Sequence, residues 1–256
     1  MNRIKNLFDH KKNNILNVYC TAGFPKLGST LEVMKALQDS GAELIELGMP
    51  YSDPLADGPI IQASGTKAIA NGMTVPVLFS QLKNFRSEIT IPVILMGYLN
   101  PALQYGFEKF CADAAEIGID GLIIPDLPMF EYEMEYGQII KKYRLDFTFL
   151  ITPETSDERI KKVDELSSGF IYAVSSSSLT GTDKDFNSVE KYLKRIKSLN
   201  LKNPVFVGFG IKDKSTFNSA CKYANGAIIG TAYINALENA DNVKVKTKEF
   251  IDGILN

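Results

Sequence analysis

Eight short apolar runs recur along the whole chain, and they limit the folds that it can adopt. The runs cover residues 15–20, 43–47, 91–96, 120–125, 147–151, 169–174, 204–209 and 226–230. They are continuously apolar, which is typical of parallel strands buried on both faces. Amphipathic helical patterns lie between them, for example at residues 29–41, 107–118, 156–169 and 214–226, and several of these end in glycine. This alternation predicts an α/β protein with a parallel sheet.

Eight strands alternating with about eight helices in 256 residues predict one closed (β/α)8 barrel, the TIM barrel fold. We expect a short helix at the N-terminus and a single domain over residues 1–256. A doubly wound open sheet is the alternative. It usually has fewer strands and often a glycine-rich turn after the first strand, where this chain has "TAGFPK".

The composition is that of an ordinary globular protein, with 45% hydrophobic residues and a formal net charge of −2. This charge balance indicates neither a nucleic-acid nor a membrane-surface partner. Neither an apolar leader nor a run of about 18 apolar residues occurs, so we expect a cytoplasmic protein. Because Cys20, Cys111 and Cys221 form no CxxC pair, we expect reduced thiols.

The chemistry of such a barrel belongs at the carboxyl ends of its strands. The single histidine, His10, precedes the first run, and no lysine ends a strand. We therefore expect neither a zinc site built on histidines nor a Schiff-base mechanism, and no metal site. Proton transfer then falls to carboxylates, supported by Tyr, Ser or Thr.

Two such carboxylates belong to "ELIELGMPYSDPLADGP", residues 43–59. Strand alternation places Leu44 and Glu46 on one face, so Glu46 points into the barrel mouth if Leu44 faces the interior. Apolar walls would raise its pKa, which suits a general acid–base; pairing with a cation or capping a helix is the alternative. Asp57 is held between prolines and a glycine, either as a positioned catalytic group or as an ordinary Asp-Gly turn.

Glycines follow the sixth, seventh and eighth strands at Gly181, Gly208, Gly210 and Gly230. They let backbone N–H groups approach a ligand, and a helix that begins at Thr231 would add its positive end. Each glycine alone could be a turn residue, but together they predict a phosphate site. The polar segment 174–187 is either a surface loop or a lid over the substrate, and we favour the lid.

At this point a family resemblance is visible. "ELGMPYSDPLADGPIIQ" resembles the signature of the tryptophan synthase α-subunit family, as do "TAGFP", "MGYLNP", "PDLP", "LTGT", "GFGI" and the final "GT". The match runs in order from Leu7 to about Leu237. It implies a TIM-barrel lyase that cleaves indole-3-glycerol phosphate by a retro-aldol reaction. The products would be indole and glyceraldehyde 3-phosphate, in the biosynthesis of L-tryptophan.

The resemblance also implies roles for individual residues. Glu46 would move protons at the indole C3 and the glycerol hydroxyl, and Asp57 would hold the indole N–H. The family's phosphate site falls on Gly181, Gly210, Gly230 and Thr231. Its indole pocket falls on Tyr19 and Tyr172. A contact that the family makes with the sixth loop falls on Asp126 and Thr180. Ser178 stands where relatives usually have glycine, so we expect the sixth loop to be stiffer or to close differently.

A partner is implied as well. Members of the family dock on a pyridoxal-phosphate β subunit in an α2β2 heterotetramer, and indole passes between the two sites. The α chain itself would need no cofactor. The docking surface would include Pro50, Asp53, Asn100 and Pro101. The competing functions are another phosphosugar barrel, such as an isomerase or indole-3-glycerol phosphate synthase, and a catalytically inactive chain that binds and activates the β subunit.

Overall fold

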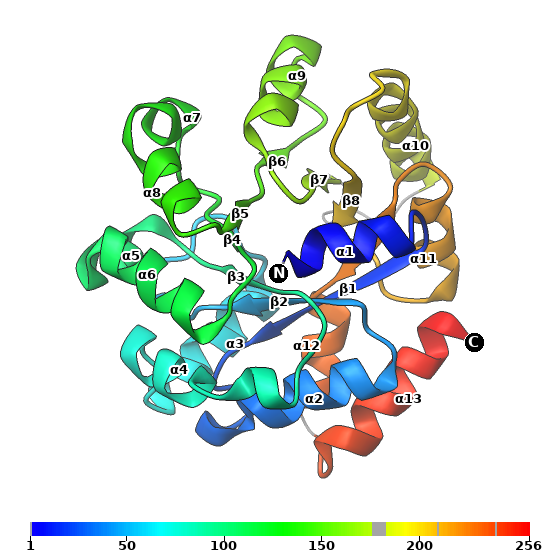
Figure 1. The fold of residues 1–256 in the computed structure, drawn as a ribbon. Helices are drawn as coiled ribbons and strands as arrows, with labels where there is room; N and C mark the ends of the chain where they lie inside the picture. The colour runs from blue at the N-terminus through cyan, green and yellow to red at the C-terminus, as the bar shows by residue number, and fades with distance from the viewer. Residues whose placement is uncertain (1, 176–182, 209, 239) are drawn as a thin grey trace.

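The strands form one parallel sheet with helices around it (Figure 1). The structure is a computed structural model that describes residues 2–175, 183–208, 210–238 and 240–256, with residues 183–187 described by their backbone only. The strands are β1 (Ile15–Thr21), β2 (Leu44–Gly48), β3 (Val93–Met96), β4 (Gly121–Ile123), β5 (Asp146–Phe147), β6 (Leu150–Ile151), β7 (Ile171–Val174), β8 (Val205–Gly208) and β9 (Gly226–Ile229). Every predicted apolar run contains strand residues.

The sheet closes into a barrel through β5 and β6. The strand order is β5-β4-β3-β2-β1-β9-β8-β7-β6, so these two short strands stand at opposite ends of the series. They are also consecutive pieces of one segment. Between them, the Thr148 N–H donates to the Leu122 carbonyl of β4 at 3.1 Å, and the Phe149 carbonyl accepts from the Tyr172 N–H of β7 at 3.0 Å. One segment therefore bonds to both neighbours, and the predicted (β/α)8 barrel is confirmed.

The prediction of one continuous strand over residues 147–151 is wrong. The strand is interrupted at residues 148–149, where it passes from pairing with β4 to pairing with β7. Serine hydroxyls take part in this change: Ser168 accepts from the Phe147 N–H at 3.0 Å and Ser167 from the Phe149 N–H at 3.4 Å. Side-chain acceptors thus replace part of the regular ladder.

Helices surround the sheet. They are α1 (Arg3–His10), α2 (Thr30–Ser40), α3 (Pro59–Ala70), α4 (Val75–Leu82), α5 (Leu99–Tyr105), α6 (Phe107–Ile117), α7 (Met129–Glu131), α8 (Gly137–Lys142), α9 (Asp157–Leu166), α10 (Asp183–Ser198), α11 (Lys214–Cys221), α12 (Thr231–Glu238) and α13 (Val243–Leu255). Two short 3-10 helices, η1 (Leu27–Ser29) and η2 (Phe85–Ser87), and a π-helix, η3 (Tyr132–Tyr136), lie between them. Helix α1 is the expected N-terminal helix. None of the helices described is long and apolar enough to cross a membrane.

The sequence predicts a glycine at the C-terminal end of four helices, and this prediction is confirmed for two of them and wrong for the other two. Gly41 ends α2 and Gly118 ends α6, both in the left-handed conformation that glycine adopts without a steric penalty. In contrast, α9 stops at Leu166 because Ser167 and Ser168 turn toward the β5–β6 segment. Helix α11 stops at Cys221, and the next residues lead into β9.

Two sets of apolar side chains lie on opposite faces of the sheet. The set inside the barrel comprises Ile15, Leu44, Ile94, Ile123, Phe170, Tyr172, Phe206 and Ile228, together with Ile4 and Phe8 of α1. The alternate strand residues, such as Val18 and Ile45, pack in the outer set. Helix α1 lies across the amino end of the barrel (Figure 1). Since Leu44 faces the interior, Glu46 two residues further on faces the same way.

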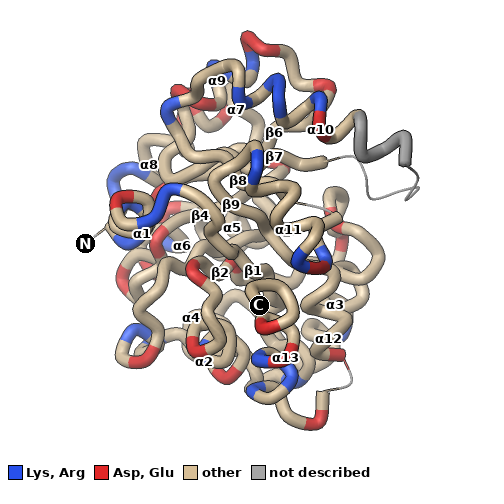
Figure 2. Tube along the Cα trace, turned by 90° about the vertical axis from the view of Figure 1, so that its right-hand side faces the viewer, with Lys and Arg blue, Asp and Glu red and all other residues tan. Residues whose placement is uncertain are grey.

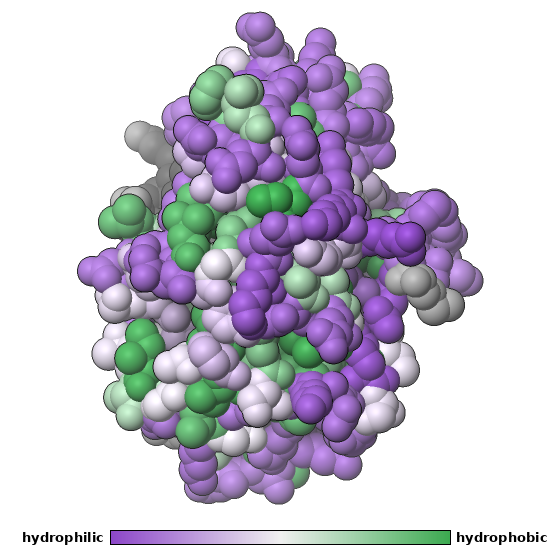
Figure 3. All heavy atoms as spheres, turned by 60° about the vertical axis from the view of Figure 1, so that its left-hand side comes forward, coloured by the Kyte–Doolittle hydropathy of each residue, from purple (hydrophilic) through white to green (hydrophobic). Residues whose placement is uncertain are grey.

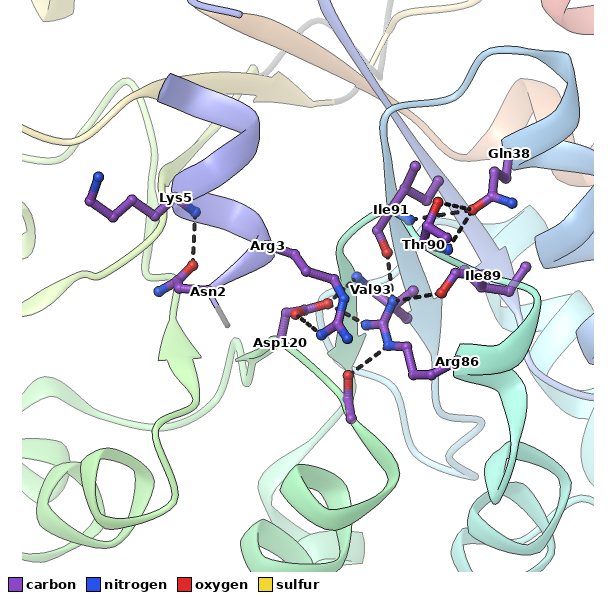
Figure 4. A network of polar contacts seen from close by, with 11 residues as sticks. Asn2, Arg3, Lys5, Gln38, Arg86, Ile89, Thr90, Ile91, Val93 and Asp120 are labelled. Carbon is purple, nitrogen blue, oxygen red and sulfur yellow. Dashed lines mark hydrogen bonds and ion pairs between the residues drawn. The ribbon is translucent and has the colours of Figure 1, made fainter. Parts of the chain in front are cut away.

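An ion network ties α1 to this amino end (Figure 4). The buried Asp120 carboxylate accepts from Arg3 of α1 at 2.9 Å, from Arg86 of η2 and from the Val93 N–H. Elsewhere on the surface, Lys and Arg residues are interspersed with Asp and Glu residues (Figure 2). The network belongs to the closed end of the barrel, away from the strand ends where catalytic groups are expected.

Candidate active site

A small cavity lies at the carboxyl end of the barrel. Its volume is about 60 Å³. The described residues that line it are Tyr19, Glu46, Asp57, Gly58, Ile61, Met96, Tyr172, Gly210, Ile211, Ile228, Gly230 and Thr231. The cavity thus brings together both predicted carboxylates, both predicted tyrosines, two of the predicted glycines and Thr231. The chain places them there because β1, β2, β7, β8 and β9 all end at this mouth.

Glu46 is fully buried in the wall of the cavity. Asn17 lies on β1, two residues before Tyr19, and also faces the interior. Its Nδ2 donates to Glu46 Oε1 at 2.6 Å. Burial raises the pKa of Glu46 from 4.5 to about 8, and the bond from Asn17 opposes part of that rise. No cation of the described residues pairs with Glu46, so the ion-pair alternative has no partner among them. A carboxyl that titrates near neutral pH can both give and take a proton.

Asp57 lies in the loop between β2 and α3. Burial raises its pKa, and a hydrogen bond with the Tyr98 hydroxyl opposes the rise. The same hydroxyl accepts from the Ala56 N–H at 2.9 Å, and Gln62 donates to the Asp57 carbonyl at 2.8 Å. The loop is therefore held on both sides of the carboxylate, beyond what an Asp-Gly turn alone would require.

Each predicted tyrosine lies against a glycine of the next strand in the chain. A Cβ built on Gly48 would overlap the hydroxyl of Tyr19, and one built on Gly208 would overlap the hydroxyl of Tyr172. Burial raises the pKa of both tyrosines well above the ordinary value, so both stay neutral. These rings form apolar walls on two sides of the carboxylates, a setting that suits a flat aromatic ligand.

The predicted phosphate residues divide into two groups. Gly210, Gly230 and Thr231 lie together along the cavity, and α12 begins at Thr231. Gly210 has φ +75°, which glycine adopts without strain. The first N–H groups of α12 have no partner within the helix, so this wall favours an anion. Gly181, Thr180 and Ser178 lie outside the described residues, as do residues 176–182 of the predicted lid.

Hydrogen bonds connect neighbouring segments at the mouth of the barrel. Asn100 donates to the Tyr51 hydroxyl at 3.2 Å, which joins the first turn of α5 to the loop after β2. Asp126 accepts from the Leu99 N–H at 2.9 Å, which joins the loop after β4 to the start of α5. The expected contact of Asp126 with Thr180 stays a prediction. Pro50 and Pro101 are half-buried, whereas Asp53 is exposed and accepts from the Ser52 hydroxyl at 2.5 Å.

No group of three or more His, Cys, Asp or Glu residues that could hold a metal ion occurs in the described part of the chain. The cavity offers carboxylates, tyrosines and backbone N–H groups. These groups can move protons, stabilise a developing positive charge on a ring and bind an anion.

The family model for the tryptophan synthase alpha chain matches residues 5–253. This chain belongs to the tryptophan synthase alpha chain family. The alpha chain of Flavobacterium johnsoniae is 55% identical over 255 residues, which are 99% of this chain and 100% of that one. The alpha chain of Parabacteroides distasonis is 52% identical and matches over 93% of each chain.

Solved structures of the tryptophan synthase family share the fold. The alpha subunit from Legionella pneumophila superposes with a TM-score of 0.88 at 33% identity, covering 99% of this chain and 98% of that one. A chain of the tryptophan synthase complex from Pyrococcus furiosus superposes with a TM-score of 0.85 at 34% identity, covering 96% and 99%. The family resemblance seen in the sequence motifs is therefore confirmed.

The sequence analysis assigned no role to two residues of the site. Tyr98 stands in "MGYLNP" at a strand end, and that position was the signal that could have linked it to the site. Asn17 is a polar residue inside the first apolar run, an exception that could have marked it. Its partner Glu46 is 29 positions away on the neighbouring strand, so no local pattern connects the pair.

Proposed function

We propose that this tryptophan synthase alpha chain cleaves indole-3-glycerol phosphate to indole and glyceraldehyde 3-phosphate, the alpha reaction in L-tryptophan biosynthesis. It is a carbon–carbon lyase that uses acid–base catalysis. One observation carries the proposal. A buried carboxyl with a pKa of about 8 shares a small cavity with a second carboxyl and with a wall of glycines at a helix N-terminus.

Glu46 and Asp57 divide the chemistry between them. Asp57 accepts the indole N–H and stabilises the positive charge that forms when the ring is protonated. Glu46 starts protonated, gives its proton to the indole C3, and takes the proton of the glycerol hydroxyl as the bond between ring and side chain breaks. The electron pair of that bond returns to the ring, and the hydroxyl oxygen becomes the aldehyde oxygen. One proton has moved from oxygen to carbon, and Glu46 is protonated again.

The remaining residues orient the substrate. Tyr19 and Tyr172 enclose the indole, whereas Gly210, Gly230 and Thr231 hold the phosphate with the N-terminus of α12. Gly181 completes the phosphate site, and Asp126 with Thr180 couples the sixth loop to the mouth. Placing ring and phosphate at opposite walls aligns the scissile bond with the carboxylates, and such positioning contributes much of enzymatic rate enhancement.

We also propose that the chain docks on a tryptophan synthase β subunit in an α2β2 heterotetramer, with the pyridoxal phosphate in the β subunit. The linked loops at the mouth, with Pro50, Asp53, Asn100 and Pro101, would form part of the surface. Exposed apolar side chains on these loops and the helices after them support it: Leu55, Leu103, Phe130 and Met134, with Leu55 90% exposed. Figure 3 shows the side of the molecule that carries α5 to α8, where apolar residues lie among hydrophilic ones.

The competing functions are less well supported. Indole-3-glycerol phosphate synthase would be expected to use lysine at the strand ends, and the described lining of the cavity holds none. A chain that only activates its partner would not need Glu46 and Asp57 in their buried positions. A cytoplasmic location and a single domain over residues 1–256 stay predictions; the single sheet that contains every strand from Ile15 to Ile229 supports the latter.

The test is indole release from indole-3-glycerol phosphate by the purified chain, alone and with a β subunit. We expect slow release from the chain alone, a strong increase with the partner, and loss of release in Glu46→Gln. Folded protein that releases no indole under either condition would leave the activating subunit as the better account. Unchanged release from Glu46→Gln would refute the acid–base assignment.

A further inference from the structure

Asn17 is a polar residue among apolar ones inside the barrel. Its interior-facing neighbours are apolar: Ile15 precedes it on β1, Leu44 stands opposite on β2 and Ile228 opposite on β9. Its exposed fraction is 0%. A buried amide costs free energy unless its polar atoms are paired. Only half of this amide is paired, because Oδ1 has no hydrogen-bond partner among the described residues.

The paired half is directed at Glu46. Nδ2 donates to Glu46 Oε1 at 2.6 Å, and Oε2 has no partner among the described residues. Glu46 lines the cavity, whereas Asn17 is absent from its described lining. The amide therefore contacts one carboxyl oxygen from beneath the cavity and leaves the other unbound. In a protonated carboxyl the carbonyl oxygen is the better acceptor, so an N–H bonded to Oε1 favours the acid proton on Oε2.

We propose that Asn17 is a positioning residue for Glu46: its amide holds Oε1 and leaves Oε2 as the oxygen that exchanges a proton with the substrate. The inference deepens the proposed function and rests on it for the identity of the substrate. While Glu46 is protonated, Oε1 is the carbonyl oxygen and the proton is on Oε2. After the proton leaves for the indole C3, Asn17 still donates to Oε1. Oε2 then receives the glycerol hydroxyl proton, so the cycle closes without moving the amide.

A purely structural role fits the observations less well. Leucine has the shape of asparagine and would extend the apolar layer of Ile15, Leu44 and Ile228. A half-paired amide at this position is thus not required for packing. Its side-chain hydrogen bond goes to Glu46, the carboxyl that transfers protons in the proposed reaction.

The groups around Glu46 decide what removal of the amide would do. Tyr19 and Cys20 come from β1, Tyr172 from β7 and Asp57 from the loop after β2, and each of these is neutral or negative. Ile94 stands beside Glu46 on β3. No cation of the described residues takes part, and the hydrogen bond from Asn17 favours the ionised form of Glu46.

The experiment compares two variants of the same shape, Asn17→Leu and Asn17→Asp, in the full chain. The titration of Glu46 is followed by infrared spectroscopy as the carboxyl band that is absent from Glu46→Gln, and this readout needs no turnover. We expect Asn17→Leu to raise the pKa of Glu46 by about one to two units, the loss expected for a hydrogen bond to a charged group. Asn17→Asp should raise it further, because two carboxylates then share one site.

Kinetics supply the second readout. Asn17→Leu should lower kcat by roughly tenfold or more, with KM within about threefold, because the proton is no longer confined to Oε2. Its thermal stability should equal or exceed that of the wild type. Ile15→Val, at the preceding interior position, is the control, and its Glu46 band should titrate as in the wild type.

An unshifted Glu46 band in Asn17→Leu would overturn the proposal, as would an equal shift in Ile15→Val. If Asn17→Leu does not fold, Asn17→Ala decides the question, because it removes the same hydrogen bond without adding a charge, and a purely structural role predicts no rise in the pKa of Glu46. Failure of the proposed function has a different signature. The wild-type chain would then release no indole, or Glu46→Gln would release it unchanged, while the infrared titration would remain readable.

Discussion

Tyr19 of β1 lies so close to Gly48 of β2 that a Cβ at residue 48 would overlap the tyrosine hydroxyl. The two residues belong to adjacent parallel strands, where Tyr19 stands opposite Glu46. The missing side chain at residue 48 therefore makes room for a ring that forms part of the cavity wall beside the catalytic carboxyl. The same relationship holds for Tyr172 and Gly208 on β7 and β8.

Gly48→Ala should displace the Tyr19 ring into the cavity. Overpacking of this kind costs about 1–3 kcal/mol of stability. A ring displaced into the cavity would also misplace the substrate, so we expect kcat/KM to fall by roughly 10- to 100-fold. The matched control is Gly65→Ala in α3, where an added Cβ meets no atom within 4 Å. That control should be neutral or stabilising, because alanine favours helix. Equal activity in both alanine variants would contradict the steric account.

Glu46→Gln should remove proton transfer and keep the shape of the side chain. Single-turnover measurements should show a rate lower by about 10²- to 10⁴-fold, the usual contribution of a general acid–base. Affinity for a non-cleavable substrate analogue should change by less than about threefold, since the amide fills the same space. A variant that fails to bind the analogue would point instead to a binding role for Glu46.

Glu46 should also make stability depend on pH. Its pKa is about 8 in the folded chain and 4.5 when unfolded, so burial favours the neutral form. The folding stability that depends on a neutral Glu46 is fully present below pH 4.5 and is lost as the pH rises through 8. Relative to the wild type, Glu46→Gln should gain of order 3–5 kcal/mol across this window. Urea unfolding at a series of pH values measures the difference, and a pH-independent difference would count against the raised pKa.

Asp57 and Tyr98 should act as a unit. Asp57→Asn removes the charge that stabilises the protonated ring, with an expected loss of about 10²- to 10³-fold in kcat. Tyr98→Phe removes the hydroxyl that bonds Asp57 and the Ala56 N–H, with an expected loss of roughly 5- to 30-fold. The double variant should be little worse than Asp57→Asn alone. Multiplying losses would show that Tyr98 acts independently of Asp57.

Phe130 and Met134 should contribute to docking on the β subunit. Both are more than 60% exposed, at 67% and 64%. Replacing both with serine should weaken binding by about 5- to 150-fold, as for central apolar residues of interfaces, and should leave indole release by the chain alone unchanged. Val245→Ser in α13, also an exposed apolar position at 54%, is the control and should bind normally. Titration calorimetry with the β subunit distinguishes the two.

Local patterns were enough to predict the barrel and much of its mouth. Buried parallel strands must be apolar on both faces, so their runs are visible one by one, and a period of two places Leu44 and Glu46 on the same side. The motif around Asp57 indicated its place because prolines and a glycine restrict the backbone there. Glycine ends of α2 and α6 followed from the same local steric rules.

Contacts between distant segments decided the rest. The bond from Asn17 to Glu46 and the contact of Tyr98 with Asp57 join residues on different strands or loops, and no local pattern encodes such pairs. The interruption between β5 and β6 depends on serines that precede β7. The elevated pKa of Glu46 is likewise a tertiary property: the sequence supplies the carboxyl, but only the closed barrel removes it from water.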